Sequence, residues 1–570
     1  NSPFADGIYY VFNSYSQKFL SRGKDWGTRA VGDDYGLPFN LKVNNDNTYA
    51  MQMLDNNCYY GDDYWMYADC TGDRVRNYSF EKTEGGFYIH NTARNVADNR
   101  VYIYLKDDAD KWAIAGNAIV GDNISDLAQA VWQVVTLAQR DSIIAVRDAA
   151  AKKAAFEAAG IREDAGLLAV GEPTVLTFET GSQWTFNSVR NGSTATTNDN
   201  GTEVFQGTGS FTQNVENLET GLYKVTIQAF YRDGSNGDVA RFTNQGYNLS
   251  TTFLDVNGTK VQVKSWGLDR IDDGNPNGMD QAKAAFGQGK YVSETFVYVA
   301  DGKLNLTVTI PSFIGAGWFI ASNVTYTKMD EEIIAGDANL DGQVTTGDAV
   351  AAVNFALEVE TPSEKAFKAA DVNKSNDITV SDAVAIVNIA LNEEPATEFE
   401  SAEFESAGAR IDLAGNYLTQ DGAEVTLVNN QQFVGFQMDV TLAQGAVFNG
   451  VQLAQRAAGL HVAYNRVAEN TYRIIAFSID NNAIEANDGA LFRLNITGEQ
   501  NVSISKIEFA DAAARAYSLK LAETTGIRSL NMAAEGTDVY TLGGVKSDKV
   551  RKGMNVVRQA NGQVRKVMVK

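Results

Sequence analysis

Two short acidic stretches, 34 residues apart, carry oxygen-bearing side chains at the spacing of a calcium-binding loop. Calcium takes about six to eight oxygen ligands, so alternate residues of one tight loop can converge on it. Position 7 of such a loop offers its backbone carbonyl, and position 12 closes the far side. The residues at positions 1, 3, 5, 7 and 12 are Asp337, Asn339, Asp341, Gln343 and Asp348 in the first loop and Asp371, Asn373, Ser375, Asp377 and Asp382 in the second. We therefore predict two calcium sites.

The two loops differ in ways that bear on affinity. Position 6 needs a left-handed backbone, which Gly342 adopts freely and Asn376 tolerates best among the other residues. At position 5 the first loop has the carboxylate of Asp341, whereas the second has the hydroxyl of Ser375. We expect weaker calcium binding at the second loop.

An amphipathic helix follows each loop, because the 34-residue repeat continues into the apolar positions. The repeated pairs are Val350 with Val384, Val353 with Val387, Asn354 with Asn388, and Leu357 with Leu391. Residues 334–394, with these two loop-helix repeats, resemble a type I dockerin, a family that binds cohesin modules on partner proteins. The resemblance implies partner contacts at loop positions 10 and 11, which are Thr346 and Gly347, then Val380 and Ser381. The two pairs differ, so we do not expect the two repeats to bind in the same way.

Length and composition set broad limits on the rest of the chain. With 570 residues, we expect roughly three to five domains. A net charge of -23 argues against nucleic-acid binding, because phosphate would be repelled over most of the surface. No apolar run approaches the roughly 20 residues of a membrane span. The two cysteines, Cys58 and Cys70, leave a disulfide and two free thiols equally open.

The N-terminal region, residues 1–136, contains short strand patterns separated by Gly, Asn and Asp turns. Similar stretches at 7–13, 48–53 and 86–91 recur at roughly 40-residue intervals. This spacing resembles the ricin-type β-trefoil, a fold that commonly binds sugars or proteins. Aromatic residues beside Asp62 and Asp63 offer a sugar-binding surface, although core packing is favoured about two to one; they are Tyr59, Tyr60, Tyr64 and Trp65.

An Ala-rich helical linker is predicted at 137–171, with an apolar stripe that docks on one neighbour. Residues 172–329 then read as strands and resemble a galactose-binding-like jelly roll. One loop there could bind a sugar, because it has an aromatic face for stacking and carboxylate and amide groups that can hydrogen-bond sugar hydroxyls. Its residues are Trp266, Asp269, Asp272 and Asn275. A solvated loop over a buried tryptophan explains the same residues equally well.

Two further β segments follow the dockerin-like region, which we bound at 330–397. Residues 398–525 resemble a cohesin-like β-sandwich, through the Gly435-Phe436-Gln437 strand and the strand beginning at Gly489. A dockerin and a cohesin-like module in one chain raise the alternative that they pair with each other, because a short tether gives a roughly millimolar effective concentration. The basic segment 526–570 resembles the C-terminal sorting-type β tails of secreted Bacteroidetes proteins.

The predicted fold class is therefore multidomain and mainly β, with a small α-helical calcium-binding module. No nucleophile elbow, zinc-protease motif or phosphate-binding glycine loop occurs in the sequence. We expect a non-catalytic, secreted or cell-surface protein that binds calcium, a cohesin on its own or another chain, and polysaccharide. A structural or adhesive protein-protein scaffold is the alternative, and a glycoside hydrolase is less favoured because an acidic chain always offers chance carboxylate pairs.

Overall fold

The structure is a computed structural model of the chain. It describes residues 3–23, 27–61, 66–93, 101–106, 114–119, 126–189, 193–232, 242–269, 276–313, 316–391, 411–522, 538–541, 546–547, 553–558 and 564–569. The chain divides into two compact units, Asn1–Glu332 and Ile333–Lys570. In the described part of the chain, no helix is long and apolar enough to cross a membrane.

The first unit begins with a closed ring of antiparallel strands. Among residues described up to 135, the ring joins β1 to β4, β5, β8, β9, β12 and back to β1. Its strands are β1 (Gly7–Asn13), β4 (Phe39–Val43), β5 (Tyr49–Met53), β8 (Asn77–Thr83), β9 (Gly86–Asn91) and β12 (Val131–Val135). The ring encloses a core that includes Val11, Met51 and Trp132.

The twelve strands described up to residue 135 form three successive units of four, β1–β4, β5–β8 and β9–β12. In each unit the second and third strands pair as a hairpin outside the ring. The hairpins pair β2 (Lys18–Gly23) with β3 (Arg29–Asp33), β6 (Tyr59–Gly61) with β7 (Tyr67–Cys70), and β10 (Val101–Lys106) with β11 (Ile114–Ile119). The threefold repeat predicted from the strand patterns at 7–13, 48–53 and 86–91 is thus present as β1, β5 and β9. Cys58 and Cys70 both lie in the described part of the chain, and no disulfide joins them.

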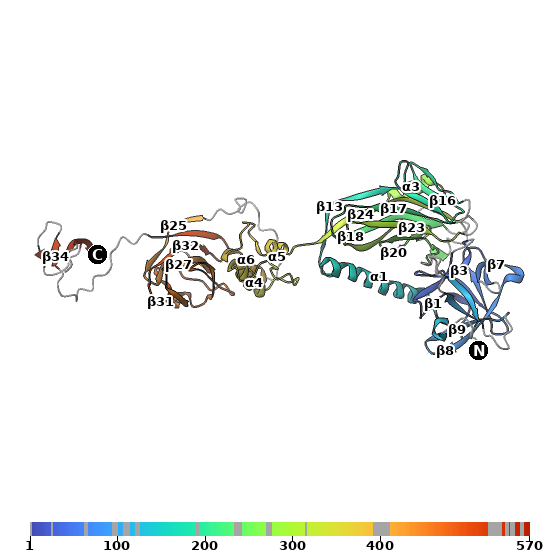
Figure 1. The fold of residues 1–570 in the computed structure, drawn as a ribbon, viewed down its shortest axis with the longest axis horizontal. Helices are drawn as coiled ribbons and strands as arrows, with labels where there is room; N and C mark the ends of the chain where they lie inside the picture. The colour runs from blue at the N-terminus through green and yellow to red at the C-terminus, as the bar shows by residue number, and fades with distance from the viewer. Residues whose placement is uncertain are drawn as a thin grey trace. The chain divides into compact units, whose positions relative to one another are not determined.

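Helix α1 (Leu137–Ala159) joins the ring to a second β body (Figure 1). Thr136 caps its first turn together with Gln139, and Gly160 ends it with φ 68°. Ile143 and Ile144 pack on the ring, whereas Phe156 packs against Leu222 and Phe296 of the second body. The prediction of a single docking neighbour is therefore wrong: the two ends of the helix bury different residues on different modules.

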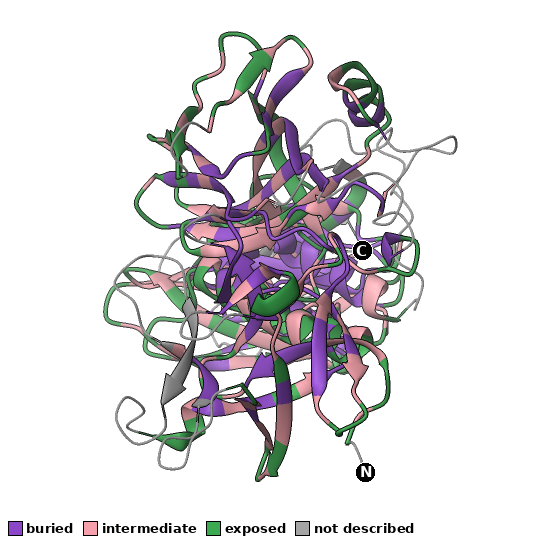
Figure 2. Cartoon of the chain, turned by 90° about the vertical axis from the view of Figure 1, so that its right-hand side faces the viewer, coloured by how far each residue is buried: buried purple, intermediate pink, exposed green. Residues whose placement is uncertain are grey.

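The second β body of this unit is a sandwich of two antiparallel-dominated sheets. In the described residues from 167 to 331, one sheet has seven strands and the other five. The first holds β13 (Leu167–Thr177), β15 (Thr196–Asn198), β16 (Gly201–Phe205), β18 (Gly221–Arg232), β21 (Lys264–Ser265), β22 (Val292–Val299) and β24 (Trp318–Glu331). The second holds β14 (Thr185–Ser188), β17 (Gly209–Val215), β19 (Phe253–Val256), β20 (Thr259–Gln262) and β23 (Leu304–Ile310). Val225 and Ile227 of one sheet meet Leu306 and Val308 of the other in the core. Exposed residues lie at turns and also along most of β13 (Figure 2).

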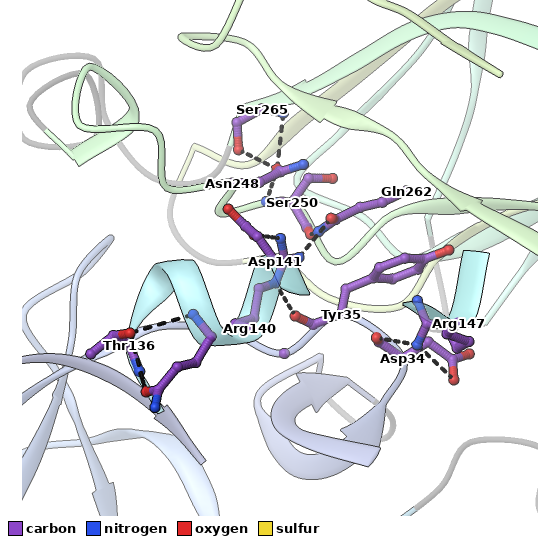
Figure 3. Close-up of polar contacts among 12 residues, drawn as sticks. Asp34, Tyr35, Thr136, Arg140, Asp141, Arg147, Asn248, Ser250, Gln262 and Ser265 are labelled. Atoms are coloured by element: carbon purple, nitrogen blue, oxygen red, sulfur yellow. Dashed lines mark hydrogen bonds and ion pairs between the residues drawn. The ribbon is translucent and has the colours of Figure 1, made fainter. Parts of the chain in front are cut away.

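Arg140 and Asp34 tie the ring, α1 and the sandwich together (Figure 3). Buried Arg140 of α1 donates from Nε to the Tyr35 carbonyl at 2.9 Å and from Nη2 to Gln262 Oε1 at 2.8 Å. Asp34 pairs with Lys18, with Arg147 of α1 and with Lys260 of the sandwich. Burial opposes the charge of Asp34, but these three cations prevail and hold its pKa below the ordinary value. Polar as well as apolar contacts thus make 1–332 one unit.

The second unit begins with three short helices, α4 (Thr346–Ala356), α5 (Glu364–Ala370) and α6 (Val380–Leu391). A β-sandwich follows, whose strand order over the described residues 411–521 is β28-β31-β26-β25-β33-β32-β27-β30-β29. The strands are β25 (Ile411–Asp421), β26 (Glu424–Val428), β27 (Gly435–Leu442), β28 (Val447–Leu453), β29 (His461–Ala468), β30 (Thr471–Phe477), β31 (Gly489–Thr497), β32 (Val502–Ala510) and β33 (Ala516–Leu521). Its core joins Phe436 and Met438 of β27 to Phe492 and Leu494 of β31.

A small sheet completes the described part of the chain, in the order β35-β34-β36-β37. Its strands are β34 (Asp538–Thr541), β35 (Lys546–Ser547), β36 (Gly553–Arg558) and β37 (Val564–Val569). The mainly β, multimodular fold class with a small helical segment is confirmed.

Candidate functional site

The carboxylates of the first acidic loop fix its backbone conformation by accepting hydrogen bonds from N–H groups of the same loop. Asp337 accepts the backbone N–H of Asp341 at 3.0 Å and of Gly342 at 2.9 Å. Asp348 accepts the backbone N–H of Asn339 at 3.0 Å and of Thr345 at 2.8 Å. Positions 1 and 12 of the loop therefore orient the turn between them.

The second loop repeats this network at every position. Asp371 accepts the backbone N–H of Ser375 and of Asn376, each at 2.8 Å, and Asp382 accepts those of Asn373 at 3.2 Å and Thr379 at 2.9 Å. The turn residues Gly342 and Asn376 have φ of 94° and 60°, the left-handed conformation that the sequence predicts. The duplication seen in the sequence is thus a duplication of local geometry.

The residues of both loops fit a calcium ion. The carboxylates at positions 1 and 12 are buried, with exposures of 1% for Asp337, 0% for Asp348, 8% for Asp371 and 0% for Asp382. Burial raises the pKa of Asp382 to about 7, backbone hydrogen bonds oppose the shift, and the charges of Asp371 and Glu508 add to it. A divalent cation would favour the charged form of such a crowded carboxylate.

Carboxylates alone do not make either site. In the described part of the chain, no group of three or more His, Cys, Asp or Glu side chains is arranged to hold a metal ion. A cation would therefore also use amide, hydroxyl and backbone oxygens, as the predicted ligand sets do. In the second loop, Ser375 Oγ donates to the Asp377 carbonyl at 3.0 Å, so two of the predicted ligand oxygens are joined to each other.

The four residues expected to contact a partner lie in two different environments. Thr346 and Gly347 are exposed, whereas Val380 and Ser381 are 0% and 1% exposed. What covers Val380 and Ser381 is the β-sandwich of the same chain. Ser381 Oγ donates to Glu508 Oε1 of β32 at 3.2 Å, and a Cβ built on Gly435 of β27 would lie 2.8 Å from Val380 Cγ2.

Helix α6 continues this contact along its length. Asn388 donates from Nδ2 to the Ala512 carbonyl and accepts from Asn481 Nδ2, both at 2.9 Å. Val384 and Val387 of α6 share one buried apolar cluster with Val434, Ile475 and Phe477 of the sandwich. We call this surface, formed by Val380, Ser381, Val384 and Asn388 with the strands they touch, the docking face.

The C-terminal end of α4 adds a second, polar contact. Arg473 of β30 donates to the Ala356 carbonyl at 2.7 Å, and Asn465 of β29 donates to the Leu357 carbonyl at 2.9 Å. Asp439 holds the Arg473 guanidinium in place by accepting two hydrogen bonds from it, at 2.8 and 3.2 Å. Burial disfavours both charges, but each partner offsets it, so the pKa of Asp439 is lowered and that of Arg473 is raised.

Arg473, Asp439 and Glu508 were not singled out from the sequence. They lie on strands far along the chain from the helices, and nothing in their local pattern distinguishes them from ordinary strand residues. The sequence signals that did point to this face are the expected partner contacts Val380 and Ser381 and the repeated pair Asn354 and Asn388. Asn388 alone of that pair is a member of the docking face.

Trp266 is 1% exposed and packs among Phe230, Phe286 and Trp318, so of the two explanations left open by the sequence the buried tryptophan is the one observed. Asp269 accepts the Tyr291 N–H and pairs with Lys264 and Lys290. Its polar role is therefore to brace the loop over a buried tryptophan, the alternative that the sequence left open. Asp272 and Asn275 lie outside the described residues.

The aromatic cluster of the ring is only partly described. Tyr60 is fully buried and Tyr59 is half-buried. Tyr64, Trp65, Asp62 and Asp63 lie outside the described residues. Core packing, which the sequence favoured, holds for Tyr60.

Comparison with known proteins finds a family match in the helical segment. The dockerin type I domain family matches residues 335–391, which span both loops and α4, α5 and α6. No curated protein sequence matches the chain.

Several solved structures are similar to parts of the chain. A non-cellulosomal cohesin from the hyperthermophilic archaeon Archaeoglobus fulgidus is 14% identical over 19% of this chain and 87% of that chain, with a TM-score of 0.16. The Coh-OlpC-Doc435 complex from Clostridium thermocellum, a type I cohesin-dockerin complex, is 13% identical over 20% of this chain and 94% of that chain, with a TM-score of 0.16. A family 35 carbohydrate-binding module from Clostridium thermocellum is 15% identical over 28% of this chain and 100% of that chain, with a TM-score of 0.15.

Proposed function

We propose that this is a non-catalytic, extracellular modular protein whose calcium-binding dockerin docks on the cohesin-like sandwich of its own chain. The observation that carries the proposal is the burial of Val380 and Ser381, the residues expected to meet a cohesin, against β27 and β32. A short tether supports the pairing further, because it gives a roughly millimolar effective concentration and keeps even a weak contact closed. Calcium in both loops would hold the docking helices in register.

The N-terminal modules give the proposal its second part, binding of carbohydrate. The closed six-strand ring with its three hairpins supports a β-trefoil at 1–136, and the two-sheet sandwich supports a galactose-binding-like jelly roll at 172–329. The helical linker at 137–171, the dockerin at 330–397 and the cohesin-like module at 398–525 complete our division of the chain. The small sheet within 526–570 is consistent with a sorting-type tail of a secreted Bacteroidetes protein. Because fold alone does not choose a ligand, a glycan array is the direct test of this part.

Cysteine cross-linking in the full chain tests the docking. In a background with Cys58→Ser and Cys70→Ala, Val384→Cys and Gly435→Cys should form an intrachain disulfide, because a Cβ at Gly435 lies 3.3 Å from Val384 Cγ2. The matched control is Val350→Cys with Gly435→Cys, which moves the cysteine to the same place in the first repeat. A protease site placed between residues 391 and 411 shows whether the two halves are joined. Equal cross-linking of both pairs, or only intermolecular products, would contradict the proposal.

A glycan array probed with the full chain separates the two candidate roles of the N-terminal modules. Binding to a defined polysaccharide class is expected for a carbohydrate-binding protein. A chain that binds no polysaccharide but still cross-links would instead be a structural scaffold built around the intramolecular contact. Cleavage of a polysaccharide, lost on substitution of one carboxylate, would show that the chain is an enzyme.

A further inference from the structure

The docking face covers one calcium loop and leaves the other open. In the second loop, Thr379, Val380 and Ser381 at positions 9 to 11 are 4%, 0% and 1% exposed. Their counterparts in the first loop, Thr345, Thr346 and Gly347, are all exposed. Two loops with the same internal hydrogen bonds therefore face different surroundings.

Ser381 connects the second loop directly to the sandwich. Its Oγ accepts a hydrogen bond from Asn373 Nδ2 at 3.1 Å and contacts Thr379 Oγ1 at 2.8 Å. The same oxygen donates to Glu508 Oε1 of β32 at 3.2 Å. A residue at loop position 3, a predicted calcium ligand, is thus linked to the docked module through one hydroxyl.

The first loop cannot make this connection. Gly347 occupies the position of Ser381 and has no side chain, and its N–H bonds to Thr345 Oγ1 at 3.1 Å within the loop. The difference between the two loops therefore comes from loop position 11, which is Gly347 in the first repeat and Ser381 in the second.

The carboxylates around the second loop also favour a bound cation when the helices are docked on the sandwich. Asp371, Asp382 and Glu508 are 8%, 0% and 1% exposed, so docking brings a buried carboxylate of the sandwich toward a loop that already holds two. Like charges in a buried setting repel strongly, and a divalent cation between them reverses the sign of the interaction.

We infer that docking encloses the cation of the second loop, so that calcium at this loop and docking stabilise each other, while the first loop exchanges calcium independently of docking. This inference rests on the proposed self-docking and adds its regulation. Coupling between two binding events is reciprocal. Calcium at the second loop therefore strengthens docking, and docking slows the release of that calcium.

Calcium release from the full chain tests the coupling. The calcium-loaded protein is mixed rapidly with excess fluorescent chelator, and release is followed by stopped flow. Docking should outweigh the missing position-5 carboxylate of the second loop, so we expect two phases, with release from the second loop slower by about tenfold or more, the size typical of coupled sites. Asp371→Ala should remove the slow phase, and Asp337→Ala should remove the fast one.

Undocking variants decide whether docking sets the slow rate. Gly435→Leu drives a side chain toward Val380. Ser381→Ala removes the hydroxyl that joins Asn373 and Thr379 of the loop to Glu508 and adds no bulk, which keeps the test informative if the first variant misfolds. Both should accelerate the slow phase toward the fast one and leave the fast phase unchanged. Val447→Lys, on an exposed strand position of the same sandwich, serves as the control and should change neither phase.

The outcomes separate this inference from the proposed function. If the Val384→Cys and Gly435→Cys pair cross-links but Gly435→Leu and Ser381→Ala leave both release phases unchanged, docking holds and the coupling is overturned. Equal acceleration of both phases would also overturn it. Failure of the cross-link itself would remove the self-docking on which the inference depends.

Discussion

At the scale of single residues, the contact between the helices and the β-sandwich of residues 333–570 depends on a few polar side chains. Each of them is held in position by a hydrogen bond to another side chain. Ser381 is held between Asn373 and Glu508, and Arg473 is held by Asp439 before it reaches the Ala356 carbonyl. A carbonyl at a helix C-terminus lacks an intrahelical donor, so a guanidinium there satisfies it and complements the helix dipole. Removing the carboxylate that positions such an arginine should weaken the contact even though the arginine remains.

We predict that Asp439→Asn destabilises the sandwich and its contact with α4 by about 1–3 kcal/mol at pH 7, because Arg473 loses its charged partner in a buried setting. The pKa of Asp439 is lowered in the folded state, so its contribution is complete above the ordinary value of 3.8 and disappears as the pH falls through the lowered value. Calorimetry of the full chain should show a lower melting temperature for the variant at pH 7. Near pH 3 the difference should shrink.

Asp421→Asn is the control for this measurement, since Asp421 is an exposed residue of β25. It should leave the melting temperature unchanged at both pH values. The assigned role would be contradicted if Asp439→Asn had the melting temperature of the wild type at pH 7. It would also be contradicted if the difference in melting temperature were larger at pH 3 than at pH 7.

The residues that the sequence predicted well are those whose partners are close in the chain. Asp337 and Asp348 bond to N–H groups inside one loop, so their spacing encodes the geometry. Glu508 and Arg473 meet the helices from strands more than 100 residues away, and no local pattern reports such a meeting. At Trp266 the sequence left two explanations open, because polar neighbours in sequence do not reveal that an indole faces the core.

At the scale of elements, α4 and α6 are repeats of one helix that use different surfaces. Val384 of α6 is fully buried on the docking face, whereas its counterpart Val350 of α4 is 49% exposed. The α4 helix instead contributes its C-terminal carbonyls to Arg473 and Asn465. The sequence predicted both helices, since loop and helix signals are local, but periodicity alone could not say which helix is covered.

We predict that Val384→Arg abolishes docking while Val350→Arg leaves it intact. The first places a charge in a buried apolar cluster without a partner, which costs several kcal/mol, whereas an exposed substitution stays within about 0.5 kcal/mol. The readout is intrachain cross-linking of Val380→Cys with Gly435→Cys, added to each variant. Loss of the cross-link in both variants, or in neither, would show that α6 has no special part in docking.

At the scale of the whole molecule, the predicted metal sites belong to only one of the two compact units. Both loops and the docking face lie in residues 333–570, whereas residues 1–332 are joined by apolar cores and by the Arg140 and Asp34 contacts. The mainly β, multimodular plan was predictable because each module has its own strand spacing and turns. The way in which α1 bridges two modules was predicted wrongly, since an apolar stripe does not show that Ile143 and Phe156 pack on different modules.

Calcium removal should therefore affect the two units unequally. A ligand that binds only the folded state stabilises it by RT ln(1 + [L]/Kd), about 2.7 kcal/mol at a concentration 100 times the Kd. Calorimetry of the full chain in calcium and then in excess chelator should show one transition that moves to lower temperature, the transition of residues 333–570, and one that stays. The double variant Asp337→Ala with Asp371→Ala should melt in calcium as the wild type does in chelator. If chelation moved both transitions equally, or if the double variant still responded to calcium, the cation would be acting outside these two loops.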